Sequence, residues 1–201
     1  MNKEMIHAAA QLFPTYEHWK NIRELPSYFE EIMALWYVEA TIRIRKHFEN
    51  SLSPEWDYAP WGNTTRDTCW FIREHGPQSL AVRFGWCYSL VLKLEDPHKF
   101  NVDAIVRLLG ESDYAPLVRE FVKNDVRHDV EPIGGRDFRF GTPYDGSFSR
   151  EDLAWYAAHE IDSFVEQAIA KIEKFTKNPQ MTELLRKVNQ IAQADASAGK
   201  K

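Results

Sequence analysis

The stretch Tyr28–Phe48, YFEEIMALWYVEATIRIRKHF, decides the fold because it predicts one long helix that is apolar on more than one side. It contains no Gly or Pro, and Pro26 just before it suits a first helical turn. We therefore expect this helix to lie between other elements, at the centre of the fold. At 100° per residue it carries two apolar stripes, one of Phe29, Met33, Trp36, Ala40 and Ile44 and another of Leu35, Val38 and Ile42.

Polar residues of the same helix suggest two different environments. Glu39, Arg43 and His47 lie in or beside the apolar sector, where an unpaired charge is costly. Glu39 and Arg43 have the favourable i, i+4 spacing, so they either neutralise each other on a packed helix or form a buried polar cluster at the bottom of a pocket, with Arg43 binding an anion. The strip expected to face water consists of Glu30, Glu31, Thr41, Arg45 and Glu49.

A second amphipathic pattern predicts one long helix from Ser149 towards Phe175, with Asp152 in the place of the usual Glu of a capping box. Its apolar face runs from Leu153 to Phe175. The spacing of His159, Asp162 and Glu166 would suit metal ligands on one helix face, but that face lies opposite the apolar one. We interpret these three residues as solvated.

Strand patterns occupy the middle of the chain. Residues 68–74 and 78–85 flank His75-Gly76-Pro77, which predicts a hairpin, and residues 86–95 alternate between apolar and polar side chains. Residues 51–63 contain Pro54, Pro60 and Gly62, so we expect an irregular connection there. A second hairpin is expected from residues 126–133 and 136–140 around Gly134-Gly135.

These elements predict a single α+β domain, with a mainly antiparallel sheet of about five strands packed against long N- and C-terminal helices. The expected organisation is a globular domain over residues 1–178, a terminal helix over residues 179–194, and a disordered tail over residues 195–201. No internal repeat is visible in the sequence.

Charge is distributed unevenly along the 201 residues, whose formal net charge is −5. Residues 1–170 carry 18 basic and 27 acidic residues, whereas residues 171–201 carry seven and three. The acidic body argues against direct nucleic-acid binding and favours a protein partner that has a basic surface.

Several sequence features favour a cytoplasmic protein. No apolar run approaches the roughly 20 residues that a membrane span requires, so we expect no membrane insertion. Glu4 and His7 stand where a signal peptide would begin its apolar segment. Cys69 and Cys87, two thiols in a chain of this length, fit a reduced compartment as buried small side chains.

Catalytic motifs are missing from the sequence. It has no Gly-x-Ser-x-Gly, no Gly-x-x-x-x-Gly-Lys and no Gly-x-Gly-x-x-Gly, and we expect neither a cofactor nor a bound metal. The alternative is a small metal-dependent hydrolase or nuclease, because acids at strand ends can hold Mg²⁺. The residues that carry this alternative are Lys93, Glu95, Asp96, Asp129 and Glu131.

Two surfaces are candidates for binding a partner. Trp56, Tyr58 and Trp61 concentrate aromatic rings in one short segment, and Trp and Tyr often anchor interfaces, although the rings could equally fold back over the core. Arg136 and Arg139 flank a hairpin that either contacts a partner or is simply solvated. We therefore expect a non-catalytic protein-interaction module of the inhibitor, immunity or adaptor type that uses an aromatic and acidic surface.

Overall fold

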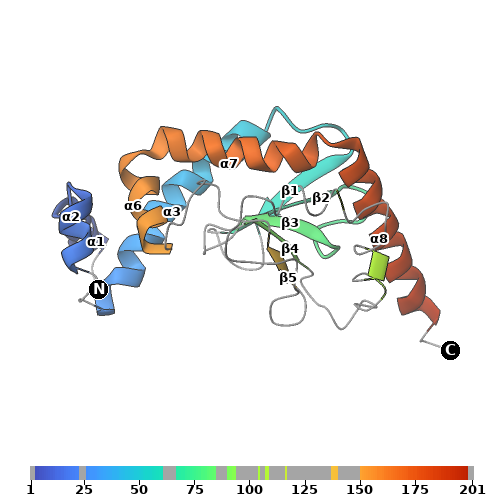
Figure 1. The fold of residues 1–201 in the computed structure, drawn as a ribbon, viewed down its shortest axis with the longest axis horizontal. Coiled ribbons are helices and arrows are strands. Elements are labelled where there is room, and N and C mark those ends of the chain that lie inside the picture. The colour runs from blue at the N-terminus through green and yellow to red at the C-terminus, as the bar shows by residue number, and fades with distance from the viewer. Residues whose placement is uncertain are drawn as a thin grey trace.

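The structure is a computed structural model that describes residues 3–22, 26–60, 67–84, 90–93, 137–139 and 150–198, together with residues 104, 107–108 and 116. Its helices and strands, drawn in Figure 1, confirm the α+β class. The described helices of more than one turn are α1 (Lys3–Gln11), α2 (Tyr16–Ile22), α3 (Pro26–Phe48), α6 (Arg150–His159), α7 (Ile161–Thr176) and α8 (Pro179–Ala198).

The strands form one antiparallel sheet. They are β1 (Trp56–Pro60), β2 (Thr68–Ile72), β3 (Ala81–Phe84), β4 (Leu90–Lys93) and β5 (Asp137–Arg139), and they pair in that order. Tyr58 stands opposite Trp70, which stands opposite Val82, so these three residues share one face of the sheet. The hairpin expected at residues 75–77 is confirmed, and Gly76 adopts the positive φ of +74° in the turn.

The prediction of an irregular connection over residues 51–63 is wrong in part, because β1 lies within it. Pro54 and Pro60 hide the strand, but Pro54 precedes it and Pro60 is its last residue, where a missing N–H is tolerated on an edge strand. Trp56 and Tyr58 alternate with Asp57 and Ala59, as a half-buried strand requires.

The prediction of a single helix over residues 149–175 is also wrong, because the helix is interrupted at Glu160. Glu160 has φ −124° and ψ 42°, which lies outside the helical region and separates α6 from α7. Figure 1 shows α7 running at a marked angle to α6. The apolar spacing continues across the break, so periodicity alone did not reveal it.

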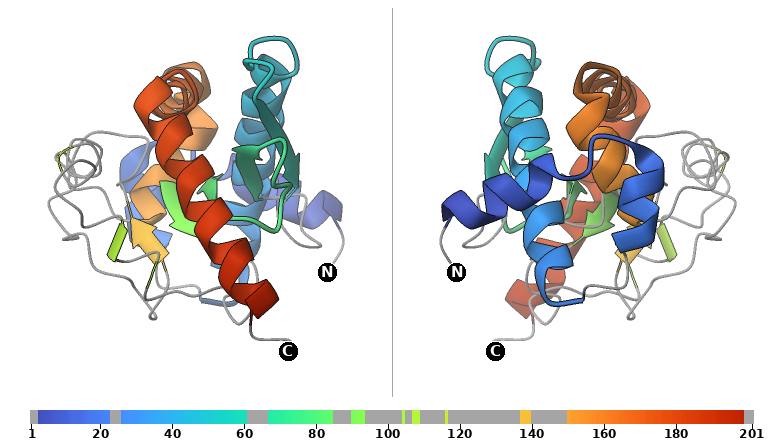
Figure 2. Two further views of the ribbon diagram at one scale, coloured as in Figure 1. Left: turned by 90° about the vertical axis from the view of Figure 1, so that its right-hand side faces the viewer. Right: turned by 90° about the vertical axis from the view of Figure 1, so that its left-hand side faces the viewer.

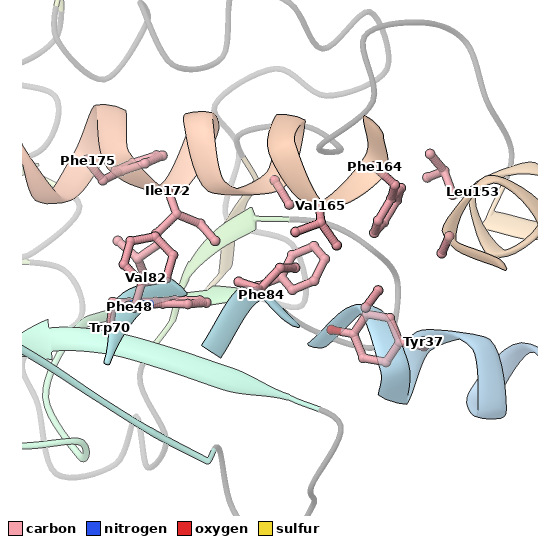
Figure 3. Close-up of a cluster of buried hydrophobic side chains, with 14 of the residues drawn as sticks. Tyr37, Phe48, Trp70, Val82, Phe84, Leu153, Phe164, Val165, Ile172 and Phe175 are labelled. Atoms are coloured by element: carbon pink, nitrogen blue, oxygen red, sulfur yellow. The ribbon is translucent and has the colours of Figure 1, made fainter. Parts of the chain in front are cut away.

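The main core lies between the sheet and the helices α3 and α7. Figure 3 shows Phe164, Ile172 and Phe175 of α7 pointing towards Phe84 and Trp70 of the sheet. All five side chains are at most 1% exposed. Burying each large apolar side chain contributes about 1.5–3 kcal/mol, so this contact fixes α7 across the sheet.

Helix α8 packs into the same core, at the right of Figure 1. Its apolar side chains at positions 181, 184, 185 and 188 are fully buried. Asn189, also buried, bonds both backbone groups of Leu80: the Leu80 N–H donates to Asn189 Oδ1 at 2.8 Å, and Asn189 Nδ2 donates to the Leu80 carbonyl at 3.4 Å. The buried positions between residues 181 and 189 therefore belong to the core, and α8 extends to Ala198.

Two further findings concern only part of the chain. The first strand of the second predicted hairpin, residues 126–133, lies outside the described residues, and β5 pairs with β4. Among the described helices, none combines the length and the apolar character that crossing a membrane requires.

Candidate functional site

Of the three aromatic residues expected to bind a partner, the first, Trp56, belongs to the core. Trp56 is fully buried, and its indole N–H donates to Thr182 Oγ1 at 3.1 Å. Tyr58 is half-buried on the same face of the sheet, and burial raises the pKa of its phenol. Trp61 lies outside the described residues. The expectation that Trp56 lies on a binding surface is therefore wrong, because strand alternation turns its ring inward.

The second expected surface falls largely outside the described part of the chain. Arg136 is not among the described residues, and Arg139 is described only as the last residue of β5, opposite Val91. The use of these two arginines in binding stays a prediction.

Glu39, Arg43 and His47 do not form a buried cluster. Arg43 Nε lies 3.0 Å from Glu39 Oε1, Arg43 Nη1 lies 2.8 Å from Asp162 Oδ1, and all three side chains are exposed by 43% or more. His47 contacts Glu173 instead, with 3.0 Å between Nε2 and Oε1. The Arg43–Asp162 and His47–Glu173 contacts both join α3 to α7 at the surface. The expectation of a buried polar cluster is therefore wrong: Arg43 forms an exposed ion triad with Glu39 and Asp162.

A partly buried polar contact does exist on α3, but at Arg45, which the sequence analysis assigned to the strip facing water. Arg45 donates from Nε to Thr68 Oγ1 at 2.7 Å and from Nη2 to the Asp67 carbonyl at 2.9 Å. Burial lowers the pKa of Arg45 from its ordinary value. Its neighbour Thr41 is 1% exposed. The contact ties α3 to the start of β2, which no pattern within either segment predicts.

The second apolar stripe of α3 is the part of that helix that the fold leaves open. Leu35 and Val38 are half-exposed, and Ile42 is 51% exposed. Leu35 and Val38 line a groove of about 610 Å³ between α1, α3 and the junction of α6 with α7. Figure 2 (right) shows α1 crossing α3, with α6 beside it. Two residues of a stripe that the sequence assigned to packing, Leu35 and Val38, therefore form the floor of an open, mostly apolar groove.

The wall formed by α6 is aromatic. The ring of His159 stacks on Trp155 at 4.6 Å between centroids and 11° between planes, and it meets Trp36 of α3 edge-on at 5.4 Å. His159 Nδ1 lies 3.0 Å from the Trp155 carbonyl oxygen. His159 was interpreted as a residue on a solvated face. It is exposed, but its i, i+4 spacing from Trp155 on α6 brings the two rings together, Trp36 of α3 lies against it, and it lines the groove.

The wall formed by α1 depends on contacts made by α2. Tyr16 donates a hydrogen bond to Asp152, and the indole N–H of Trp19 donates to the Glu151 carbonyl at 3.0 Å. Trp19 is fully buried and stacks on Phe29 at 4.7 Å between centroids. These contacts dock α2 on α6 and α3, and they hold α1 at the side of the groove.

Acidic residues lie in and beside the groove, whose lining also contains His7 and His159. Glu39 lines the groove, and Glu160 and Asp162 are exposed on either side of the lining residue Ile161. Arg43, placed between Glu39 and Asp162, neutralises part of this charge. The rim therefore keeps negative charge close to an apolar floor, which suits a ligand that is apolar on one face and basic at its edges.

Metal chemistry finds no support among the described residues. No three His, Cys, Asp or Glu side chains in the described ranges are grouped so that they could hold a metal ion. The residues of the hydrolase alternative are outside those ranges except Lys93, the last residue of β4. Cys69 is a fully buried thiol that donates to the Ala59 carbonyl at 3.5 Å. The hydrolase alternative stays a prediction that no observation favours.

Comparison with known proteins supplies no analogy for the groove: no protein-family model matches the chain, and no curated protein or solved structure is significantly similar to it.

Proposed function

We propose that this chain is a non-catalytic, cytoplasmic protein-interaction module of the inhibitor, immunity or adaptor type, and that the groove between α1, α3 and the α6–α7 junction is its binding surface. The observation that carries the proposal is the open apolar stripe of α3. This stripe, formed by Leu35, Val38 and Ile42, remains partly exposed. The other stripe of the same helix is buried in the core.

Two properties of the groove favour a protein over a small molecule as its ligand. The groove is open to solvent, whereas a small-molecule site encloses most of its ligand. Aromatic rings of Trp36 and His159 stand beside the apolar floor, with charged groups at the rim. An apolar centre with an aromatic anchor and a polar rim is the usual composition of a protein interface.

The groove's position also suits a rigid binding surface. Its floor belongs to α3, whose opposite stripe packs against the sheet, and its walls are helices held by the Tyr16 and Trp19 contacts. A preformed surface loses little conformational entropy on binding, which favours affinity.

The test compares wild type with Val38→Asn and with the matched control Leu12→Asn. Val38 lines the groove, whereas Leu12, which is 69% exposed, is not among the lining residues. Each purified variant is immobilised and exposed to an extract of the native host, and the recovered partner is then purified and titrated calorimetrically against all three proteins. We expect wild type and Leu12→Asn to bind equally and Val38→Asn to bind about ten-fold more weakly.

Thermal denaturation monitored by circular dichroism shows whether each variant is folded. Equal binding of the purified partner by a folded Val38→Asn variant would remove the groove as the binding surface, and with it the proposed function.

A further inference from the structure

We infer that the groove receives one amphipathic helix of the partner, with an apolar face of about two turns and Lys or Arg residues beside it. This inference rests on the proposed function and adds the shape and charge of the occupant.

The length of the occupant follows from the exposed stripe of α3, of which Leu35 and Val38 line the groove and Ile42, 51% exposed, lies beyond the lining residues. Leu35 and Ile42 are seven residues apart on α3, which is about 10 Å along the helix axis, and Val38 lies between them. Side chains at i, i+3 or i+4, and i+7 of a second helix repeat over the same distance. One face of a two-turn helix therefore matches the exposed length of the stripe.

A helix suits this groove better than an extended peptide does. The groove is bounded by α1, α3, α6 and the start of α7, whose interior backbone groups already bond within their own helices. An extended peptide needs an open sheet edge to satisfy its N–H and C=O groups, and the groove offers none among its lining residues. A helical occupant satisfies its own backbone and presents only side chains.

The charge of the occupant follows from the rim. Glu39 lines the groove, Glu160 and Asp162 flank the lining residue Ile161, and Arg43 bonds Glu39 and Asp162. Residues 1–170 as a whole carry an excess of nine acidic residues, so a basic helix is also attracted at longer range. Arg43 moderates this attraction, and its removal should strengthen the binding of a basic helix rather than weaken it.

The experiment uses two 18-residue helical peptides that share the same stripe of leucines. In one peptide all remaining positions are lysine, and in the other they are glutamate. Each carries fluorescein at its N-terminus, and binding to the full chain is followed by fluorescence anisotropy at two salt concentrations. We expect the Leu/Lys peptide to bind, more weakly at high salt, and the Leu/Glu peptide to bind at least ten-fold more weakly.

Variants locate the binding. We expect Val38→Asn to weaken binding of the Leu/Lys peptide about ten-fold, with Leu12→Asn unchanged. Asp162→Asn should weaken it about two- to five-fold, and Arg43→Met should strengthen it by a similar factor. The matched control is Glu183→Gln on α8, which also removes an exposed acid from an ion pair and should leave binding unchanged.

The inference is overturned if neither peptide binds, if the two peptides bind equally, if Val38→Asn and Leu12→Asn behave alike, or if sedimentation shows that a second copy of the chain covers the groove. The proposed function survives the first two outcomes provided that Val38→Asn still loses the natural partner. Failure of that partner experiment, in contrast, removes both.

Discussion

Trp56 and Thr182 offer a sharp test of how the sheet and the last helix are joined. The indole N–H of Trp56 donates to Thr182 Oγ1 at 3.1 Å, and both residues are at most 5% exposed. Thr182→Val keeps the shape of the side chain and removes the only acceptor described for that N–H. The Thr182 hydroxyl also donates to the Asn178 carbonyl. In the variant that carbonyl still accepts a hydrogen bond from the backbone N–H of residue 182, at 3.0 Å.

The expected magnitude follows from this geometry. A buried donor left without an acceptor costs about 1–3 kcal/mol, so Thr182→Val should lower the free energy of unfolding by that amount. In a Trp56→Phe background the donor is already missing, and the same substitution should cost less than about 1 kcal/mol. The coupling free energy of the double-mutant cycle should therefore be about 1–2 kcal/mol.

Urea denaturation followed by circular dichroism at 222 nm measures all four proteins, with equal m-values as the condition for comparing them. A coupling below about 0.5 kcal/mol would refute the buried hydrogen bond, since independent sites add within that range. The companion variant Trp56→Ala should lose about 3–5 kcal/mol. If Trp56→Ala unfolds at the same urea concentration as wild type, Trp56 is a surface residue and the assignment of β1 to the core is wrong.

Three further predictions concern stability and pH. Asn189→Ala should lower the free energy of unfolding by about 2–3 kcal/mol and raise the hydrogen-exchange rate of the Leu80 amide, because that buried N–H loses its acceptor; unchanged exchange would contradict this. Arg45→Met should lower the free energy of unfolding by about 1–3 kcal/mol in urea denaturation, whereas the exposed control Lys46→Met should stay within about 0.5 kcal/mol; equal effects would refute the partly buried contact. His75 has a side chain that is 7% exposed, and burial lowers its pKa below its unfolded value of about 6.5. Its unfolded form therefore binds a proton first, so the stability it contributes above pH 6.5 is lost as the pH falls towards the lowered folded pKa. His75→Gln should flatten the profile of stability against pH in this window, and parallel profiles would show that His75 does not titrate differently on folding.

The fold was predictable where side-chain periodicity coincides with packing. The two stripes of α3 and the β2–β3 hairpin follow from local spacing, because an element that buries one face must carry apolar residues at its own period. The break at Glu160 was not predictable in this way, since the apolar face keeps the helical period across it. Strand β1 was not predicted because of two prolines, of which Pro54 precedes the strand and Pro60 is its last residue.

The candidate site was less accessible to sequence reasoning, because exposure is a property of the assembled helices. Leu35, Val38 and Ile42 were recognisable as an apolar stripe, but only the placement of α1 and α7 shows that nothing in the described chain covers it. Arg45 and Arg43 illustrate the same limit. They lie two residues apart, yet Arg45 reaches the start of β2 whereas Arg43 stays at the surface beside Asp162.

The position of α8 in the core has a consequence for synthesis of the chain. Asn189 completes the bonding of Leu80 from 109 residues further along, and Thr182 does the same for Trp56 across 126 residues. At about 5–20 residues per second, a ribosome needs roughly 5–20 s after finishing β3 before these partners emerge. During that interval the apolar face of the first three strands has no helix α8 to cover it. Chaperone binding to nascent chains should therefore be strongest between the synthesis of β3 and that of α8.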